Sequence, residues 1–271
     1  MKLAFRCAIL AGLAGACTNQ GLDPQGDVLV SAAVSLTDGL QEVVRTYEQA
    51  TGERVTLNLG PSNGLARQVL EGAPSDVFIS ADERQMQRVE DAGRVVSGGR
   101  LDLLTNQLAA VVAPSLTPVP ESPSDLLRVG VRRVVIGDPA AVPAGVYARR
   151  YLESVGLWDQ LEPKLVPVSS VRAALSAVEN DVADVAFVYR TDARVAKAAR
   201  LAFVVPLAEG PDIVYPLGLL ENARNPDGAR RFVDYLRGLQ ASRIFERYGF
   251  GVSHGAGGVA GPSSRGARVE P

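Results

Sequence analysis

VLVSAAVSLTDGLQEVVRTYEQATGERVTLNL, residues 28–59, sets a pattern that the rest of the chain repeats. The β-branched run Val28–Val34 predicts a strand, and the amphipathic run Leu36–Ala50, stopped by Gly52, predicts a helix. Val55–Leu59 predicts a second strand. Strands that alternate with helices in this way indicate an α/β protein with mainly parallel sheets.

The same alternation continues as far as Val252. Further helices are expected at Leu65–Glu71, Glu83–Ala92, Val146–Val155, Arg172–Asn180, Asp227–Gly238 and Ala241–Tyr248. Further strands are expected at Val77–Ser80, Ala109–Ala113, Arg133–Ile136, Lys164–Val168, Asp184–Tyr189, Phe203–Pro206 and Ile213–Leu220. This order predicts two lobes, the first from residues 27–108 and 207–252 and the second from residues 109–206, with a ligand cleft between them.

Residues 1–17, MKLAFRCAILAGLAGAC, predict an export signal, because basic residues precede an apolar run that is too short to span a bilayer. The end of this run is similar to a bacterial lipoprotein cleavage box, which would leave Cys17 lipidated as the new N-terminus. Ordinary signal cleavage near Ala16 is the alternative. Cys7 is the other cysteine, so the mature domain is expected to hold no disulfide and no thiolate metal site. The expected location is periplasmic or extracytoplasmic, with a lipid anchor as the one possible attachment to the membrane.

The charge of the chain argues against a nucleic acid partner. Of its 271 residues, 28 are basic and 30 are acidic, and they are scattered along the chain with a net charge of -2. Binding to a phosphate backbone would need a basic surface. We expect a monomer.

An enzyme is the main alternative class, because serine at a strand-to-helix turn also describes hydrolase nucleophiles. The single histidine, His254, lies in residues 253–271, which are rich in Gly, Ser and Pro and are predicted to be disordered. A Ser–His pair is therefore not expected, and neither a G-x-S-x-G motif nor a Walker phosphate loop occurs. A Ser–Lys arrangement stays open, although Lys164 and Lys197 lie in no motif.

Four predicted strand-to-helix junctions carry small or hydroxyl residues where the first N–H groups of a helix lack an intrahelical partner. The junctions are AVSLT at 33–37, GPSNG at 60–64, VPAG at 142–145 and SSVR at 169–172. Free N–H groups and the positive end of the helix dipole favour an anion there. Taken singly, each serine is more often a helix cap, and Ser35 with Asp38, Ser62 and Ser170 all fit that role.

Several separated motifs resemble the periplasmic molybdate-binding proteins. They are SAAVSLTDGL at 31–40, GPSNGLARQVLEGAPSDVFISAD at 60–82, GDPAAVPAGVYA at 137–148, LEPKLVPVSSVRAALSAVE at 161–179, AFVYRTDA at 186–193 and RRFVDYLRGLQASRIFERYGF at 230–250. The resemblance implies an α/β, two-lobed periplasmic binding protein fold of type II with the ligand cleft between the lobes. It also implies capture of molybdate or tungstate for the membrane permease and the ATPase of an ABC transporter, with no cofactor.

By motif position, the resemblance implies which groups hold the oxyanion. They are the hydroxyls of Ser35, Ser62 and Tyr189 and the backbone N–H groups of Ala144 and Val171. In the second loop, Asn63 is the alternative to Ser62, because the family tends to have a run of serines there.

These groups suit an anion that only accepts hydrogen bonds. A fully deprotonated tetrahedral oxyanion needs donors, whereas protonated phosphate would leave its own proton unpaired among groups that are not acidic. Sulfate has the same shape and charge, so a receptor for sulfate, for another oxyanion or for a small carboxylate stays an alternative.

Overall fold

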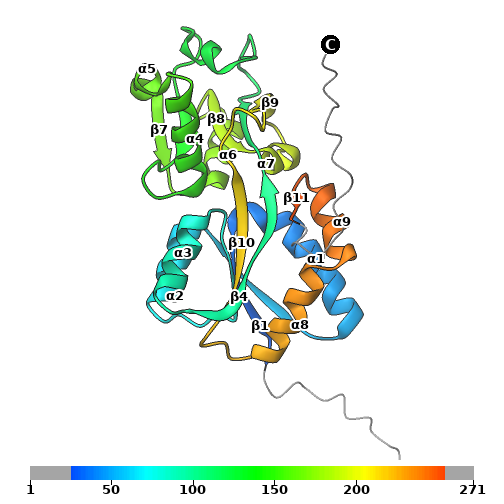
Figure 1. The fold of residues 1–271 in the computed structure, drawn as a ribbon. Coiled ribbons are helices and arrows are strands. Elements are labelled where there is room, and N and C mark those ends of the chain that lie inside the picture. Colours follow the sequence, from blue (N-terminus) through cyan, green and yellow to red (C-terminus); the bar gives the residue numbers. More distant parts are fainter. Residues whose placement is uncertain (1–25, 254–271) are drawn as a thin grey trace, which may run out of the picture.

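The computed structural model describes residues 26–253, which form two α/β lobes stacked along the long axis of the molecule (Figure 1). The predicted export signal with Cys17 lies outside the described residues, as does the predicted tail from residue 254 onward. Both therefore stay predictions. A search of residues 26–253 for a helix long and apolar enough to cross a membrane found none.

The first lobe is built on a six-stranded sheet with the order β11-β4-β10-β3-β1-β2. Its strands are β1 Val28–Ala33, β2 Val55–Gly60, β3 Val77–Ile79, β4 Val95–Asn106, β10 Ile213–Leu220 and β11 Gly251–Val252. β1 pairs in parallel with β2 and β3, whereas β10 runs antiparallel to β3 and β4.

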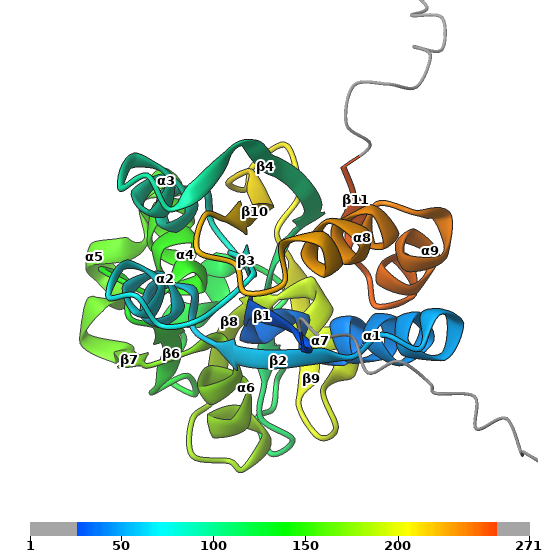
Figure 2. The ribbon, with the colours of Figure 1, turned by 90° about the horizontal axis from the view of Figure 1, so that it is seen from below.

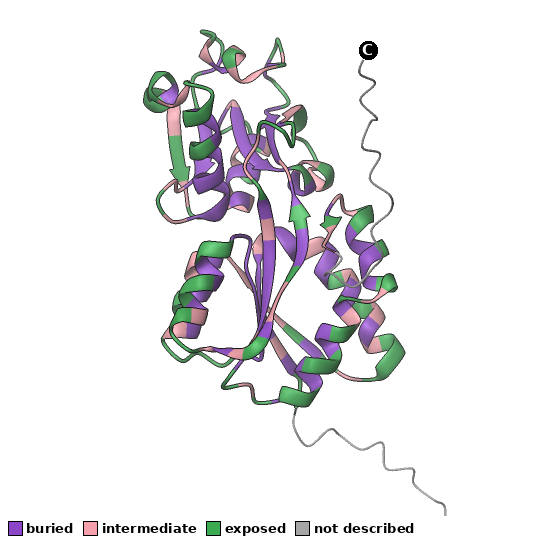
Figure 3. Ribbon diagram, viewed as in Figure 1, coloured by how far each residue is buried: buried purple, intermediate pink, exposed green. Residues whose placement is uncertain are grey.

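Helices cover both faces of this sheet (Figures 1 and 2). They are α1 Thr37–Thr51, α8 Pro226–Leu236 and α9 Leu239–Arg247 on one face, and α2 Ser62–Leu70 and α3 Glu83–Asp91 on the other. The short 3-10 helix η1, Val34–Leu36, joins β1 to α1. Because both faces are covered, the central strands are almost continuously buried (Figure 3).

The second lobe is built on a five-stranded sheet with the order β7-β6-β8-β5-β9. Its strands are β5 Leu108–Val112, β6 Val134–Gly137, β7 Leu165–Val168, β8 Val185–Tyr189 and β9 Arg200–Val204. Its helices are α4 Pro143–Ser154, α5 Trp158–Leu161, α6 Val171–Glu179 and α7 Arg190–Val195, with 3-10 turns η2 Pro123–Leu127 and η3 Glu162–Lys164. β6 is parallel to β7 and β8, and β5 is antiparallel to β8 and β9.

The lobes are joined by neighbouring strands. β4 ends at Asn106 and β5 begins at Leu108 in the other sheet, while the chain returns from β9 into β10. Since β4 and β10 pair with one another, the two crossings lie side by side (Figure 1).

Three expectations from the sequence need correction. Both sheets are mixed rather than mainly parallel. Helix α2 begins at Ser62 and α4 at Pro143, three residues earlier than expected in each case. Proline is compatible with the start of a helix, and the small or polar residues that follow Pro61 and Pro143 belong to the first turn. Strand β4 was not predicted, since Gly98 and Gly99 interrupt its pattern and its pairing with β10 compensates for their weak strand preference.

Candidate functional site

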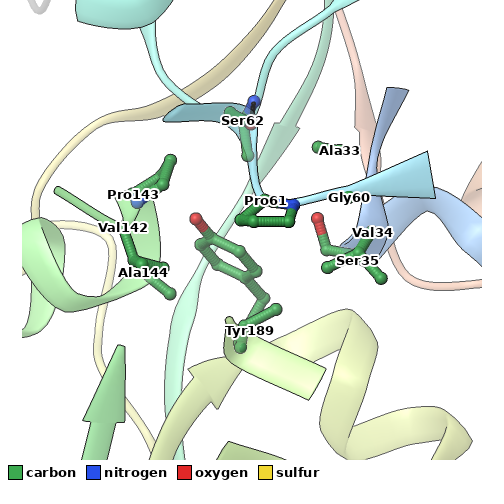
Figure 4. A pocket seen from close by; sticks show the side chains of 12 residues that line it. Ala33, Val34, Ser35, Gly60, Pro61, Ser62, Val142, Pro143, Ala144 and Tyr189 are labelled. Carbon is green, nitrogen blue, oxygen red and sulfur yellow. Dashed lines mark hydrogen bonds between the residues drawn. The ribbon is translucent and has the colours of Figure 1, made fainter. Parts of the chain in front are cut away.

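A small pocket with a cavity volume of about 10 Å³ lies between the lobes. It is lined by Ala33, Val34, Ser35, Gly60, Pro61, Ser62, Ala81, Val142, Pro143, Ala144, Val171 and Tyr189 (Figure 4). All five residues predicted to bind an oxyanion are in this lining, whereas Asn63 is not. A space of this size suits a ligand of a few heavy atoms, so binding of a sugar would require a wider cleft.

Ser35 is contributed by η1, at the carboxyl end of β1. It is buried, and its hydroxyl oxygen lies 3.0 Å from the hydroxyl oxygen of Tyr215. The capping interpretation of Ser35 is wrong, because Ala33 and Leu36 occupy the N-cap positions of η1 and α1 and neither helix start has a side-chain cap. Ser35 is therefore available to a ligand in the pocket.

Ser62 is the first residue of α2 and is also buried. Its Oγ accepts a hydrogen bond from the backbone N–H of Ala81 at 2.9 Å, and it does not cap α2. Because this backbone group can only donate, the hydroxyl proton of Ser62 remains free to donate elsewhere. The contact with the loop after β3 thus orients Ser62 as a donor.

The starts of α4 and α6 contribute backbone donors from the second lobe. Ala144 is the second residue of α4 and Val171 the first of α6, so neither N–H has an acceptor within its own helix. The start of α4 lies directly against β6: a Cβ at Gly145 would stand 1.9 Å from the carbonyl oxygen of Gly137, so only glycine fits there. Ser170 does act as a cap, because its Oγ accepts from the N–H of Ala173 at 3.1 Å.

Tyr189, the last residue of β8, is the most informative side chain of the site. Its hydroxyl is buried and has no hydrogen-bond partner among the described residues. Burial raises the pKa of Tyr189 well above its ordinary value, so the hydroxyl keeps its proton and can donate. An unpaired buried hydroxyl costs about 1–3 kcal/mol, so its presence inside a pocket indicates a ligand that accepts a hydrogen bond.

Figure 4 shows that the side chains of Ser35, Ser62 and Tyr189 approach one another, with residues 142–144 beside them. Every polar side chain in the lining is a hydroxyl, and none is ionisable at neutral pH. The arrangement can bind a compact anion through several neutral donors and two helix N-termini.

An ion-pair cluster joins the lobes next to Val171. Arg172 Nη2 lies 2.7 Å from Asp38 Oδ2 in α1, and Arg172 Nε lies 2.6 Å from Asp192 Oδ1 in α7. Asp192 is fully buried, and burial raises its pKa to about 6 although Arg172 acts to lower it. Because Asp38 and Arg172 belong to different lobes, their ion pair requires the lobes to be close together.

Asn106 and Tyr215 lie behind Ser35 and were not predicted from the sequence. Asn106 Nδ2 donates to the hydroxyl oxygen of Tyr215 at 3.2 Å. These residues are 109 positions apart and belong to the crossing strands, so no local motif indicated their contact.

Comparisons with known proteins agree with this architecture. The molybdate-binding protein ModA of Escherichia coli is 37% identical over 249 residues, which cover 89% of this chain and 95% of that protein. A putative ABC transporter substrate-binding lipoprotein, YvgL of Bacillus subtilis, is 32% identical over 91% of this chain and 96% of its own length. The structure of the periplasmic molybdate-binding protein of Azotobacter vinelandii shares the fold, with a TM-score of 0.78, 24% identity and coverage of 84% of this chain and 100% of that one.

A family model described as bacterial extracellular solute-binding protein matches residues 28–251, which include both lobes and every residue that lines the pocket. An α/β fold with a ligand pocket between two lobes is the architecture that such a receptor requires, and this chain belongs to the bacterial extracellular solute-binding proteins.

Proposed function

We propose that this protein captures molybdate, and also tungstate, outside the cytoplasm and delivers it to an ABC transporter. The observation that carries the proposal is the buried hydroxyl of Tyr189, which has no partner among the described residues and lies in a pocket lined by no side chain that is charged at neutral pH. The similarity to molybdate-binding proteins supports the choice of ligand.

The chemistry of the donors supports a fully deprotonated oxyanion. Ser35, Ser62, Ala144, Val171 and Tyr189 line the pocket from both lobes, and we propose that the three hydroxyls and the N–H groups of Ala144 and Val171 are its donors. Such an anion can accept from all of them, and hydrogen bonds to a charged acceptor are stronger than those between neutral groups. Hydrogen phosphate would instead bring a donor into a site with no carboxylate to receive it.

Binding rather than catalysis fits the residues that line the pocket. Its side chains are apolar or carry a hydroxyl, so neither a general base nor a charged nucleophile faces the ligand. Neutral donors hold the anion without a covalent step, which allows it to be released again.

We further propose that closure of the lobes on the anion creates the surface that the membrane permease and its ATPase detect. The pocket has walls from both lobes, and the ion pair between Asp38 and Arg172 bridges them, so a bound anion favours the closed arrangement. The receptor is proposed to act as a monomer, tethered through a lipid on Cys17.

Isothermal titration of the purified protein with molybdate, tungstate, sulfate and phosphate tests the proposal. Tight one-to-one binding of molybdate and tungstate, with no heat from phosphate, is the expected result. Binding of sulfate in place of molybdate would show that the protein is a receptor for a different oxyanion. Lack of binding by all four anions would refute the oxyanion function.

A further inference from the structure

We propose that Asn106 and Tyr215 form a one-way hydrogen-bond chain that holds Ser35 as a donor and so helps to select fully deprotonated oxyanions. The chain runs from Asn106 at the end of β4, through Tyr215 in β10, to Ser35 at the pocket. The inference rests on the proposed function, because it concerns how the same pocket distinguishes its ligands.

The direction of this chain begins with Asn106. Its Oδ1 accepts the backbone N–H of Gln107 at 2.9 Å, which identifies the opposite side of the amide as the nitrogen. That nitrogen, Nδ2, donates to Thr191 Oγ1 at 2.9 Å and to the Tyr215 hydroxyl oxygen at 3.2 Å. Both amide protons are therefore in use, and Asn106 Nδ2 has no capacity to accept.

Tyr215 transmits this direction to Ser35. Its side chain is fully buried, and burial raises the pKa of Tyr215, so the hydroxyl keeps its proton. Because Asn106 already donates to the Tyr215 oxygen, the proton of Tyr215 is directed to the Ser35 oxygen, 3.0 Å away. The proton of Ser35 is then left for the ligand.

Reversing the chain would be costly. If Ser35 accepted a proton from a ligand and donated its own to Tyr215, the Tyr215 oxygen would accept from both Ser35 and Asn106, and neither of them would remain to accept the Tyr215 proton. A buried hydroxyl would then be unpaired, at a cost of about 1–3 kcal/mol. Hydrogen phosphate presents such a proton, whereas molybdate and sulfate do not.

The position of the chain links it to the closed pocket. Thr191 belongs to α7 in the second lobe, so Asn106 connects that lobe to the hydroxyl network behind Ser35 in the first lobe. The ring of Tyr215 also packs against that of Tyr189, with centroids 5.9 Å apart and an angle of 63°. Tyr215 thus contacts two of the three hydroxyl residues predicted to bind the ligand.

Substitution Tyr215→Phe tests the proposal, because it removes the hydroxyl and keeps the ring that packs against Tyr189 and Phe250. We expect the affinity for molybdate to fall about tenfold, the effect of losing one well-oriented donor, and the ratio of molybdate to phosphate affinity to shrink. Ser35→Ala should cause a similar loss. Tyr47→Phe is the matched control, since Tyr47 is a buried tyrosine whose hydroxyl bonds Glu53 instead.

The double variant separates positioning from general packing. If Tyr215 acts through Ser35, adding Tyr215→Phe to Ser35→Ala should lower the affinity no further. A full additional loss, or a Tyr215→Phe variant with unchanged affinity and unchanged selectivity, would overturn the proposal. Thermal melting of each variant shows that folded protein is being compared.

The wild-type titrations distinguish failure of this inference from failure of the proposed function. If the wild type binds sulfate and not molybdate, the proposed ligand is wrong, and the same variants test the hydrogen-bond chain with sulfate. If the wild type binds none of molybdate, tungstate, sulfate and phosphate, both proposals fail together.

Discussion

Replacing Tyr189 by phenylalanine should separate ligand binding from folding. The change removes a buried hydroxyl that has no partner among the described residues and leaves the ring packed against Tyr215. A hydrogen bond to a charged acceptor contributes about 1.5–3 kcal/mol, so we expect the affinity for molybdate to fall roughly tenfold to a hundredfold.

The same substitution should not destabilise the ligand-free protein. Because the hydroxyl of Tyr189 makes no hydrogen bond within the described structure, its removal costs the fold no such bond and relieves the burial of a polar atom. A loss of 1 kcal/mol would lower the melting temperature of a protein of this size by about 2–4 °C. We therefore expect the melting temperature of Tyr189→Phe to be at or above that of the wild type.

Calorimetric titration and thermal melting of the same preparation measure the two quantities. Tyr235→Phe is the matched control, because the hydroxyl of Tyr235 is also buried with no partner in residues 26–253, but its ring packs against Tyr47, away from the pocket lining. The control should keep its affinity. An unchanged affinity in Tyr189→Phe would show that its hydroxyl does not bind the ligand, and a fall of several degrees in the melting temperature would show that the hydroxyl stabilises the fold.

Three further changes probe the residues around the pocket. Asp38→Asn removes the charge that pairs with Arg172 across the lobes. Since this ion pair is partly exposed, we expect the affinities for molybdate and tungstate to fall by the same factor of about two to five. Unequal losses in titrations with the two anions would contradict a role of this ion pair in closure of the lobes. Ser170→Ala removes the cap on the N–H of Ala173 and should lower the free energy of unfolding by about 1 kcal/mol in denaturant melts, with affinity almost unchanged. Asp192→Asn tests the buried carboxyl, whose folded-state pKa of about 6 lies above the ordinary pKa of an aspartate. As pH falls, the folded protein therefore takes up this proton before the unfolded chain does. The stability of the wild type relative to this variant should therefore rise as pH falls from 7 to 4, and a constant difference across thermal melts in that range would count against the raised pKa.

Much of the fold could be predicted because its signals are local. The alternation of β-branched runs and amphipathic runs stopped by glycine, as at Gly52, predicted α1 and the strands on either side of it. The pocket lining could also be proposed, because strand-to-helix junctions gather at one edge of each sheet and the motifs around Ser35 and Tyr189 resemble a known family.

The features that were missed depend on contacts between distant parts of the chain. Strand β4 carries Gly98 and Gly99, and its place in the sheet depends on pairing with β10 more than a hundred positions later. The contact between Ser35 and Tyr215 joins residues 180 positions apart. Neither hydrophobic periodicity nor a short motif carries that information, so the contact between the hydroxyls of Tyr215 and Ser35 is visible only in the folded structure.

An anomalous diffraction map of crystals grown with tungstate would show directly whether this pocket binds the oxyanion. We expect one strong peak for tungsten between the hydroxyls of Ser35, Ser62 and Tyr189 and the N–H groups of Ala144 and Val171. A peak elsewhere on the molecule, with this pocket empty although tungstate binds in solution, would contradict this expectation.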